Sequence, residues 1–181
     1  PVYYEQAGLL GEWIGRTGRT LVYGGSRCGL MEAVAQGVRK AGSVNVIGIV
    51  PKILIDREMV SECVGVKVPT EGLTDRKEFL IKLSDIMVAM PGSVGTLDEA
   101  FSMAASGTLY YHDKRVVVYN MKGFWDDMER LLEGLQRQGF IRGDYRLRIA
   151  FARTLDEVIA HFKEKEPKGE IVIVLAGKSE K

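Results

Sequence analysis

Residues 85–99 read DIMVAMPGSVGTLDE, and two different periodicities meet within this stretch. From Asp85 to Met90 the residues form a nearly continuous apolar run, which is typical of a strand buried on both faces of a parallel sheet. A proline and a glycine end this run, and a helix is expected to start near Thr96. The stretch therefore predicts a strand, a glycine-containing turn and a helix in direct succession.

The same alternation continues in both directions along the chain. Apolar residues at helical spacing predict helices over 3–18, 31–42, 74–83, 125–138 and 155–162, with a weaker helical pattern after residue 51. Short apolar runs predict further strands over 21–23, 44–50, 64–68 and 115–119. Strands that alternate with helices in this way predict an α/β fold, in which a doubly wound parallel sheet carries helices on both faces.

The composition limits the classes of protein to which this chain can belong. Its 181 residues, 46% of them hydrophobic, can form one sizeable core but are too few for two ordinary domains. Its 25 basic and 24 acidic residues give a net charge of +1, so no broad field favours nucleic acid or a membrane surface. The two cysteines form no CxxC pair, and no apolar run is long enough to span a bilayer. We expect a single cytoplasmic domain, without a metal or a cofactor, that binds any anion locally.

The turn between the strand and the helix can serve two purposes. Gly92 and Gly95 let the backbone curl so that successive N–H groups, and the positive end of the helix, face one point that suits a phosphate. The same residues also fit a capping box, in which Thr96 caps the helix and Glu99 reaches back to it. The residues alone leave both interpretations open, and a second glycine turn, over 24–29, is a weaker signal on its own.

Three segments carry a resemblance to a known family. Residues 22–31 read VYGGSRCGLM, residues 91–99 read PGSVGTLDE, and residues 75–77 read DRK. They are similar, respectively, to the VYGGGxxGLM segment, the PGGxGTxxE signature and the end of the MHxRK element of the LOG family. Along the chain the three segments follow one another as these elements do in the family, with the MHxRK-like segment in the middle. Members of that family are cytokinin riboside 5′-monophosphate phosphoribohydrolases, often labelled lysine decarboxylases. The resemblance implies a Rossmann-like fold and hydrolysis of the N-glycosidic bond of AMP or an N6-substituted AMP.

The resemblance also implies roles for particular residues. Arg76 and Glu99 match the essential arginine and glutamate of the family. A carboxylate near the ribose can stabilise the positive charge that develops as the base departs, whereas an arginine stays charged and suits positioning and electrostatics. The remaining residues that we expect to bind the substrate lie in the two turns and beside Arg76: Gly24, Gly25, Ser26, Lys77, Pro91, Gly92, Ser93, Val94, Gly95 and Thr96.

Several departures from the family pattern affect these expectations. Ser93 stands where the signature has its second glycine, and a serine there would be strained if its φ had to be positive. Ser26 replaces the third glycine of the other turn. Leu73 and Thr74 replace a Met-His pair, and position 73 falls where the family contacts the base, which leaves the preferred base open.

The two ends of the chain also depart from the family. Family members begin with a strand and a Gly-Ser-rich loop ahead of the helix that starts here near Tyr3. Residues 170–179 read EIVIVLAGKS and predict a strand followed by a Gly-Ser turn. We therefore divide the chain into a Rossmann-like domain over 1–162 and, over 163–181, a charged linker with an extra strand. That strand is either an edge strand or tail, an arm inserted into a partner, or the occupant of the first strand's place in a permuted chain.

Other functions remain as alternatives. A non-catalytic protein of the same fold can bind or carry a nucleotide or molybdenum cofactor, although retention of both Arg76 and Glu99 argues against this. A nicotinamide-dependent oxidoreductase would need a GxGxxG turn followed by an acidic residue after the next strand, and neither is present. A lysine decarboxylase is the least expected function, because nothing in the sequence marks a lysine as the ligand of pyridoxal phosphate. The expected partners are a nucleoside monophosphate and a second copy of the chain. The second copy is suggested by residues 101–105, which carry more apolar side chains than the core-facing side of one helix needs.

Overall fold

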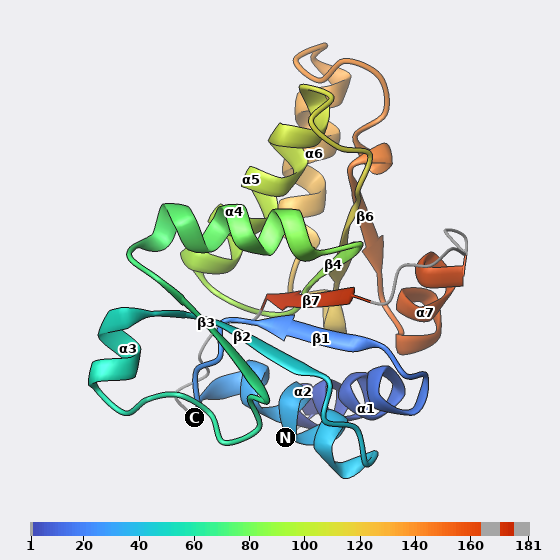
Figure 1. Cartoon of the computed structure of the whole chain (residues 1–181). Coiled ribbons are helices and arrows are strands. Elements are labelled where there is room, and N and C mark those ends of the chain that lie inside the picture. Colours follow the sequence, from blue (N-terminus) through green and yellow to red (C-terminus); the bar gives the residue numbers. More distant parts are fainter. Residues whose placement is uncertain (1, 164–170, 176–181) are drawn as a thin grey trace.

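The computed structural model describes residues 2–163 and the backbone of residues 171–175 (Figure 1). The helices are α1 (Val2–Arg16), α2 (Gly29–Lys40), α3 (Lys52–Asp56), α4 (Leu73–Leu83), α5 (Val94–Thr108), α6 (Asp126–Arg137) and α7 (Leu155–Lys163). The strands are β1 (Thr20–Tyr23), β2 (Val46–Pro51), β3 (Val66–Thr70), β4 (Ile86–Ala89), β5 (Val116–Tyr119), β6 (Ile149–Ala152) and β7 (Ile171–Leu175). Two short 3₁₀ turns cover Met121–Gly123 and Tyr145–Leu147.

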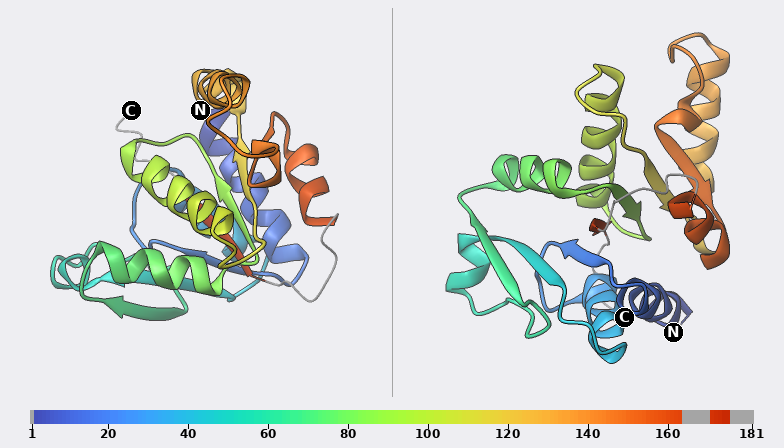
Figure 2. Two further views of the ribbon diagram at one scale, coloured as in Figure 1. Left: turned by 90° about the horizontal axis from the view of Figure 1, so that it is seen from above. Right: turned by 45° about the vertical axis from the view of Figure 1, so that its right-hand side comes forward.

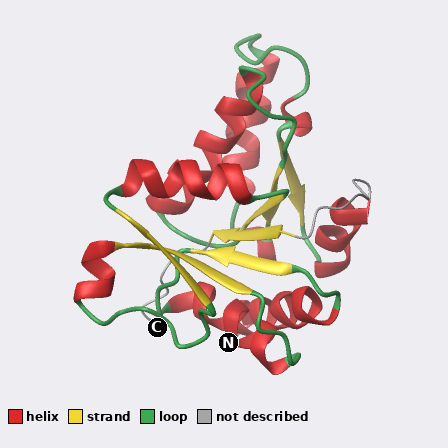
Figure 3. Ribbon diagram, in the orientation of Figure 1, coloured by secondary structure: helices red, strands yellow, loops and turns green. Residues whose placement is uncertain are grey.

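The described strands form one sheet in the order β3-β2-β1-β7-β4-β5-β6, and every pair of neighbours is parallel. Figure 3 shows the strands between two layers of helices. The α/β class and the parallel, doubly wound sheet predicted from the sequence are confirmed. Among the described helices, none has both the length and the apolar character that are needed to cross a bilayer.

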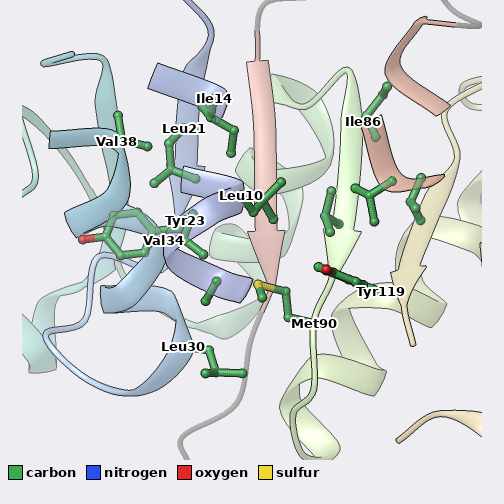
Figure 4. Packing of buried hydrophobic residues seen from close by; sticks show 14 of the residues in the cluster. Leu10, Ile14, Leu21, Tyr23, Leu30, Val34, Val38, Ile86, Met90 and Tyr119 are labelled. Atoms are coloured by element: carbon green, nitrogen blue, oxygen red, sulfur yellow. The ribbon is translucent and has the colours of Figure 1, made fainter. Parts of the chain in front are cut away.

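Two apolar clusters, one on each face of the sheet, make up the core. Alternate residues of β1 belong to different clusters, because successive side chains of a strand point to opposite faces of the sheet. Leu21 and Tyr23 pack in the first cluster with residues of α1, α2 and α7, whereas Val22 packs in the second with residues of α4, α5 and α6. Figure 4 shows the first cluster from close by, and Figure 2 shows α1 and α2 on the opposite side of the sheet from α4 and α5.

One strand was missed by the sequence interpretation. Strand β6 follows the second 3₁₀ turn and pairs with β5 at the edge of the sheet. Two of its four residues, Ala150 and Ala152, are alanines, which prefer strands less than the valines of β5 do. The segment therefore carries little of the signal by which the other strands were predicted.

Strand β7 lies in the middle of the sheet. Its backbone pairs in parallel with β1 on one side, where Val172 aligns with Leu21, and with β4 on the other, where Ile173 aligns with Met87. Ile171–Leu175 is thus neither an edge strand nor outside the sheet. The linker over 164–170 and the Gly-Ser segment after β7 lie outside the described residues.

Helices α1 and α2 approach each other closely through glycines. A Cβ atom built on Gly11 would overlap the carbonyl oxygen of Val34 and lie 3.0 Å from the Cα of Gly37. These neighbours are backbone atoms, which cannot move aside as the end of a flexible side chain can. A methyl group would meet open space at Gly8, which lies about one turn earlier in the same helix.

This pair of glycines allows a matched test of the helix packing. We expect Gly11→Ala to lower the free energy of unfolding by about 1–3 kcal/mol or more, because the added methyl group forces the two helices apart. We expect Gly8→Ala to raise it by about 0.5–1 kcal/mol through helix propensity. Urea denaturation followed by circular dichroism measures both values. Equal stabilities for the two variants would contradict the close packing.

Candidate functional site

The two glycine turns lie at the same edge of the sheet. One turn follows β1 and the other follows β4, and these strands run parallel on either side of β7. Their carboxyl ends therefore point the same way, toward the edge at which open parallel sheets bind ligands. Helix α4 and the first turn of α5 complete this edge (Figure 1).

The turn after β4 leads directly into α5. The helix begins at Val94 with Ser93 as its N-cap, so the start expected near Thr96 was wrong by two residues. The backbone N–H of Leu97 donates to the carbonyl of Ser93 at 3.1 Å and closes the first helical turn. By helix geometry, the N–H groups of Val94, Gly95 and Thr96 have no acceptor within the helix. They are available to an anion at the positive end of α5.

This geometry answers two questions raised by the sequence. The backbone of Ser93 has φ −111° and ψ −161°, an extended conformation that serine adopts without strain, and its side chain makes no cap hydrogen bond. The capping-box interpretation is wrong, because Thr96 is a buried residue inside the helix rather than its N-cap. Glu99 lies in the second turn of α5 and therefore does not cap the helix.

An ion pair joins α4 to α5 at this edge. Nη2 of Arg76 lies 3.3 Å from Oε1 of Glu99, and the two side chains are 16% and 15% exposed. Burial raises the pKa of the Glu99 carboxyl above its ordinary value, and the neighbouring Asp98 adds to this, while the charge of Arg76 opposes it. The pair is thus shielded from bulk water, yet each member remains open to a ligand.

A second link between the same helices involves Lys77. Its Nζ lies 3.0 Å from Asp98, with which it pairs, and 3.5 Å from the hydroxyl of Ser102. Sequence reasoning did not single out Asp98 or Ser102. Their spacing of four residues, which places both on one face of α5, was the available signal. The expected contact of Lys77 with a substrate remains a prediction.

The turn after β1 is held by its surroundings. Gly25 has φ +69°, which favours glycine, and a Cβ there would lie 2.6 Å from Cγ2 of Val50. Its carbonyl accepts a hydrogen bond of 2.8 Å from the N–H of Ser61. The hydroxyl of Ser26 is buried and lies 3.0 Å from Sγ of Cys28. Any contact of Gly25 or Ser26 with a ligand would therefore come mainly from the backbone.

The structure thus brings Arg76, Glu99 and both turns to one edge of the sheet. Gly92 and Pro91 shape the loop ahead of Ser93, and Pro91 is buried while Ser93 is exposed. In the described part of the chain, no group of three or more histidine, cysteine or acidic side chains is placed to hold a metal ion. The backbone N–H groups at the start of α5 can bind an anionic group, and the carboxylate of Glu99 can stabilise positive charge.

Comparison with solved structures shows the same architecture in other proteins. The molybdenum cofactor binding protein of Rippkaea orientalis superposes with a TM-score of 0.69 at 23% identity, covering 91% of this chain and 88% of that one. The molybdenum cofactor carrier protein of Chlamydomonas reinhardtii gives a TM-score of 0.68 at 23% identity, covering 90% and 87%. At this level of identity, the likeness concerns the fold alone.

Comparison of sequences gives a more specific result. Residues 31–162 match the family model described as possible lysine decarboxylase. The probable cytokinin riboside 5′-monophosphate phosphoribohydrolase LOGL2 of Oryza sativa is 35% identical over 172 residues, which are 95% of this chain and 70% of that protein. The phosphoribohydrolase LOG3 of Arabidopsis thaliana is 35% identical over 165 residues, or 91% and 76%. With the two glycine turns and the Arg76–Glu99 pair in place, these matches show that the chain belongs to the LOG family.

Proposed function

We propose that this protein hydrolyses the N-glycosidic bond of a nucleoside 5′-monophosphate, AMP or an N6-substituted AMP, to the free base and ribose 5-phosphate. The observation that carries the proposal is the partly buried Arg76–Glu99 pair beside the open N-terminus of α5. The N-terminus of α5 suits a phosphate, and the carboxylate of Glu99 suits the positive charge that develops on a ribose. The names of the relatives agree with this assignment.

The phosphate is assigned to the first turn of α5. The N–H groups of Val94, Gly95 and Thr96 and the positive end of the helix dipole favour a dianion there. Ser93 and Gly95 are exposed, so a ligand can reach the backbone without displacing a packed side chain. This site lies remote from the bond that breaks, and its binding energy serves to position the glycosidic bond.

The ribose is assigned to the region of Glu99. As the base departs with the electrons of the glycosidic bond, C1′ becomes positively charged, and the carboxylate stabilises that charge. A water oxygen then bonds to C1′, and the proton that it loses to Glu99 or to solvent balances the proton that the departing base takes up. Because burial raises the pKa of Glu99, the carboxyl loses its charge at a higher pH than an ordinary glutamate as the medium is acidified. Arg76 holds the carboxylate and the nucleotide in position.

The base is assigned to the start of α4. Leu73 is 69% exposed and precedes Arg76 by three residues, which places both on one face of the helix. An exposed leucine offers an apolar contact to a purine ring or to an apolar N6 substituent.

The free thiols of Cys28 and Cys63 fit a reducing compartment, and we assign the protein to the cytoplasm.

A carrier or binding function is the second candidate, because the molybdenum cofactor proteins share the fold. Such a protein would need the anion site but would have no use for a shielded carboxylate paired with an arginine. The Arg76–Glu99 pair therefore favours hydrolysis. Binding of AMP without release of base would favour the carrier instead.

The protein is also proposed to form a homodimer. The apolar residues that suggested this from the sequence do not support it, because Met103 and Ala104 are buried in the chain's own core. Support comes instead from the C-terminal end of α5, where Leu109, Tyr110 and Tyr111 are 68%, 90% and 80% exposed. Three adjacent exposed apolar side chains are typical of a surface that is covered by a partner.

The substrate assignment predicts dependence on the 5′-phosphate. We expect purified protein to release adenine from AMP and base from N6-substituted AMPs, but to leave adenosine essentially intact, because adenosine cannot use the α5 site for positioning. Chromatography of the free base and of ribose 5-phosphate measures both reactions. Equal turnover of AMP and adenosine would contradict the assignment.

The catalytic assignment predicts the effect of removing one charge. We expect Glu99→Gln to lower turnover of AMP by roughly a hundredfold or more, a loss comparable to deleting one electrostatic stabiliser, while AMP binding changes less. Glu78→Gln, at an exposed position on α4, serves as the control and should retain turnover. Initial rates and calorimetric binding separate the two effects. Near-normal turnover of Glu99→Gln would remove Glu99 from the mechanism.

The dimer assignment predicts the effect of charge at the end of α5. We expect light scattering at micromolar concentration to give twice the mass of the chain. The double variant Tyr110→Lys/Tyr111→Lys should shift that mass toward the monomer, since two lysines oppose burial. Val44→Lys, at a 66% exposed position outside this surface, should leave the dimer intact. A monomeric mass for the unaltered protein would refute the proposal.

A further inference from the structure

The guanidinium group of Arg76 lies directly against the turn after β1. A Cβ atom built on Gly24 would overlap Nη2 of Arg76 and lie 3.2 Å from its Cζ. Gly24 is buried and follows Tyr23, the last residue of β1. The side chain of Arg76 therefore connects three elements: helix α4, from which it comes, the turn after β1, which it touches, and helix α5, where it pairs with Glu99.

The backbone does not account for glycine at position 24. Its neighbour Gly25 has a positive φ, but Gly24 is not among the residues with positive φ. The next nearest atom to a Cβ at Gly24, after those of Arg76, is Sδ of Met31 at 3.5 Å, an ordinary van der Waals contact. The space that a side chain would need at position 24 is thus occupied by one group, the guanidinium of Arg76.

We propose that Gly24 is a positioning residue, whose missing side chain leaves room for Arg76 to lie beside Glu99. The inference rests on the proposed hydrolase function for its effect on turnover, but the placement of Arg76 can be tested without a substrate. Nε of Arg76 is buried without a hydrogen-bond partner, so this atom does not hold the guanidinium in place. A methyl group at position 24 would therefore move it.

Displacement of Arg76 has a defined electrostatic consequence for Glu99. Burial raises the pKa of this carboxyl, and Arg76 is the largest influence that lowers it, ahead of Lys77, while Asp98 raises it. If the guanidinium moves away, burial acts with less opposition and the pKa rises further. The carboxylate then loses its charge at a higher pH, and the acid limb of the pH profile moves upward.

The test is a double-mutant cycle on Gly24→Ala and Arg76→Ala, with the pKa of Glu99 as the readout. NMR titration of protein labelled at the glutamate side-chain carboxyl carbons, with the Glu99 signal assigned by its loss in Glu99→Gln, needs no substrate. We expect Gly24→Ala to fold, because only the end of a flexible side chain has to move, and to raise the pKa of Glu99. In the Arg76→Ala background, Gly24→Ala should change that pKa little further, since the group through which it acts is gone.

Turnover of AMP provides the second readout. Gly24→Ala should lower kcat/KM by roughly tenfold to a hundredfold, as expected for a misplaced positioning group, and should move the acid limb upward. Gly8→Ala adds a methyl group in open space on α1, outside the site, and should change neither quantity. If no variant and no unaltered protein cleaves AMP, the proposed function fails, while the titration still decides the role of Gly24.

The outcomes separate clearly. An unchanged pKa of Glu99 in Gly24→Ala, or equal increments from Gly24→Ala in the two backgrounds, would overturn the inference. If Gly24→Ala alone fails to fold while Gly24→Ala/Arg76→Ala folds, the collision with Arg76 is demonstrated directly. If both fail to fold, the alanine collides with something other than Arg76, and the inference is wrong.

Discussion

The ion pair between Arg76 and Glu99 is the constraint on which the arrangement of the site depends. Two charges that are largely removed from water are tolerated when they face each other, because an unpaired buried charge is costly. Their pairing holds α4, which follows β3, against α5, which follows β4. Strands β3 and β4 lie on opposite sides of the sheet's centre. A contact between two side chains thus ties together two halves of the sheet at the edge where we propose that the substrate binds.

The sequence predicted most of the fold because its strands are short apolar runs with clear stops. Val116–Tyr119 is entirely apolar and buried, and the run before Pro91 is equally plain. Strand β6 escaped prediction because two of its residues are alanine. The start of α5 was misplaced because threonine at position 96 is a good cap in isolation, whereas the chain uses Ser93 as its N-cap.

The site was predictable in its parts but not in its geometry. The family signature drew attention to Arg76 and Glu99, yet nothing local indicates that residues from different helices form an ion pair. Periodicity within a helix describes neighbours three and four positions apart, and it carries no information on contacts between helices. The pairing of Lys77 with Asp98 and the contact of Arg76 with Gly24 have the same origin in tertiary packing. The fold itself is shared with molybdenum cofactor proteins, so function must be argued from these side chains.

The central place of β7 has a consequence for biosynthesis. A ribosome makes β1 and β4 before β7, the strand that lies between them in the sheet. Until β7 has left the exit tunnel, the edges of β1 and β4 that face each other have no backbone partner, and such edges are prone to pair with other chains. The sheet can therefore close only after β7 has been synthesised. An interruption of synthesis before β7 would leave these two edges exposed and prone to aggregation.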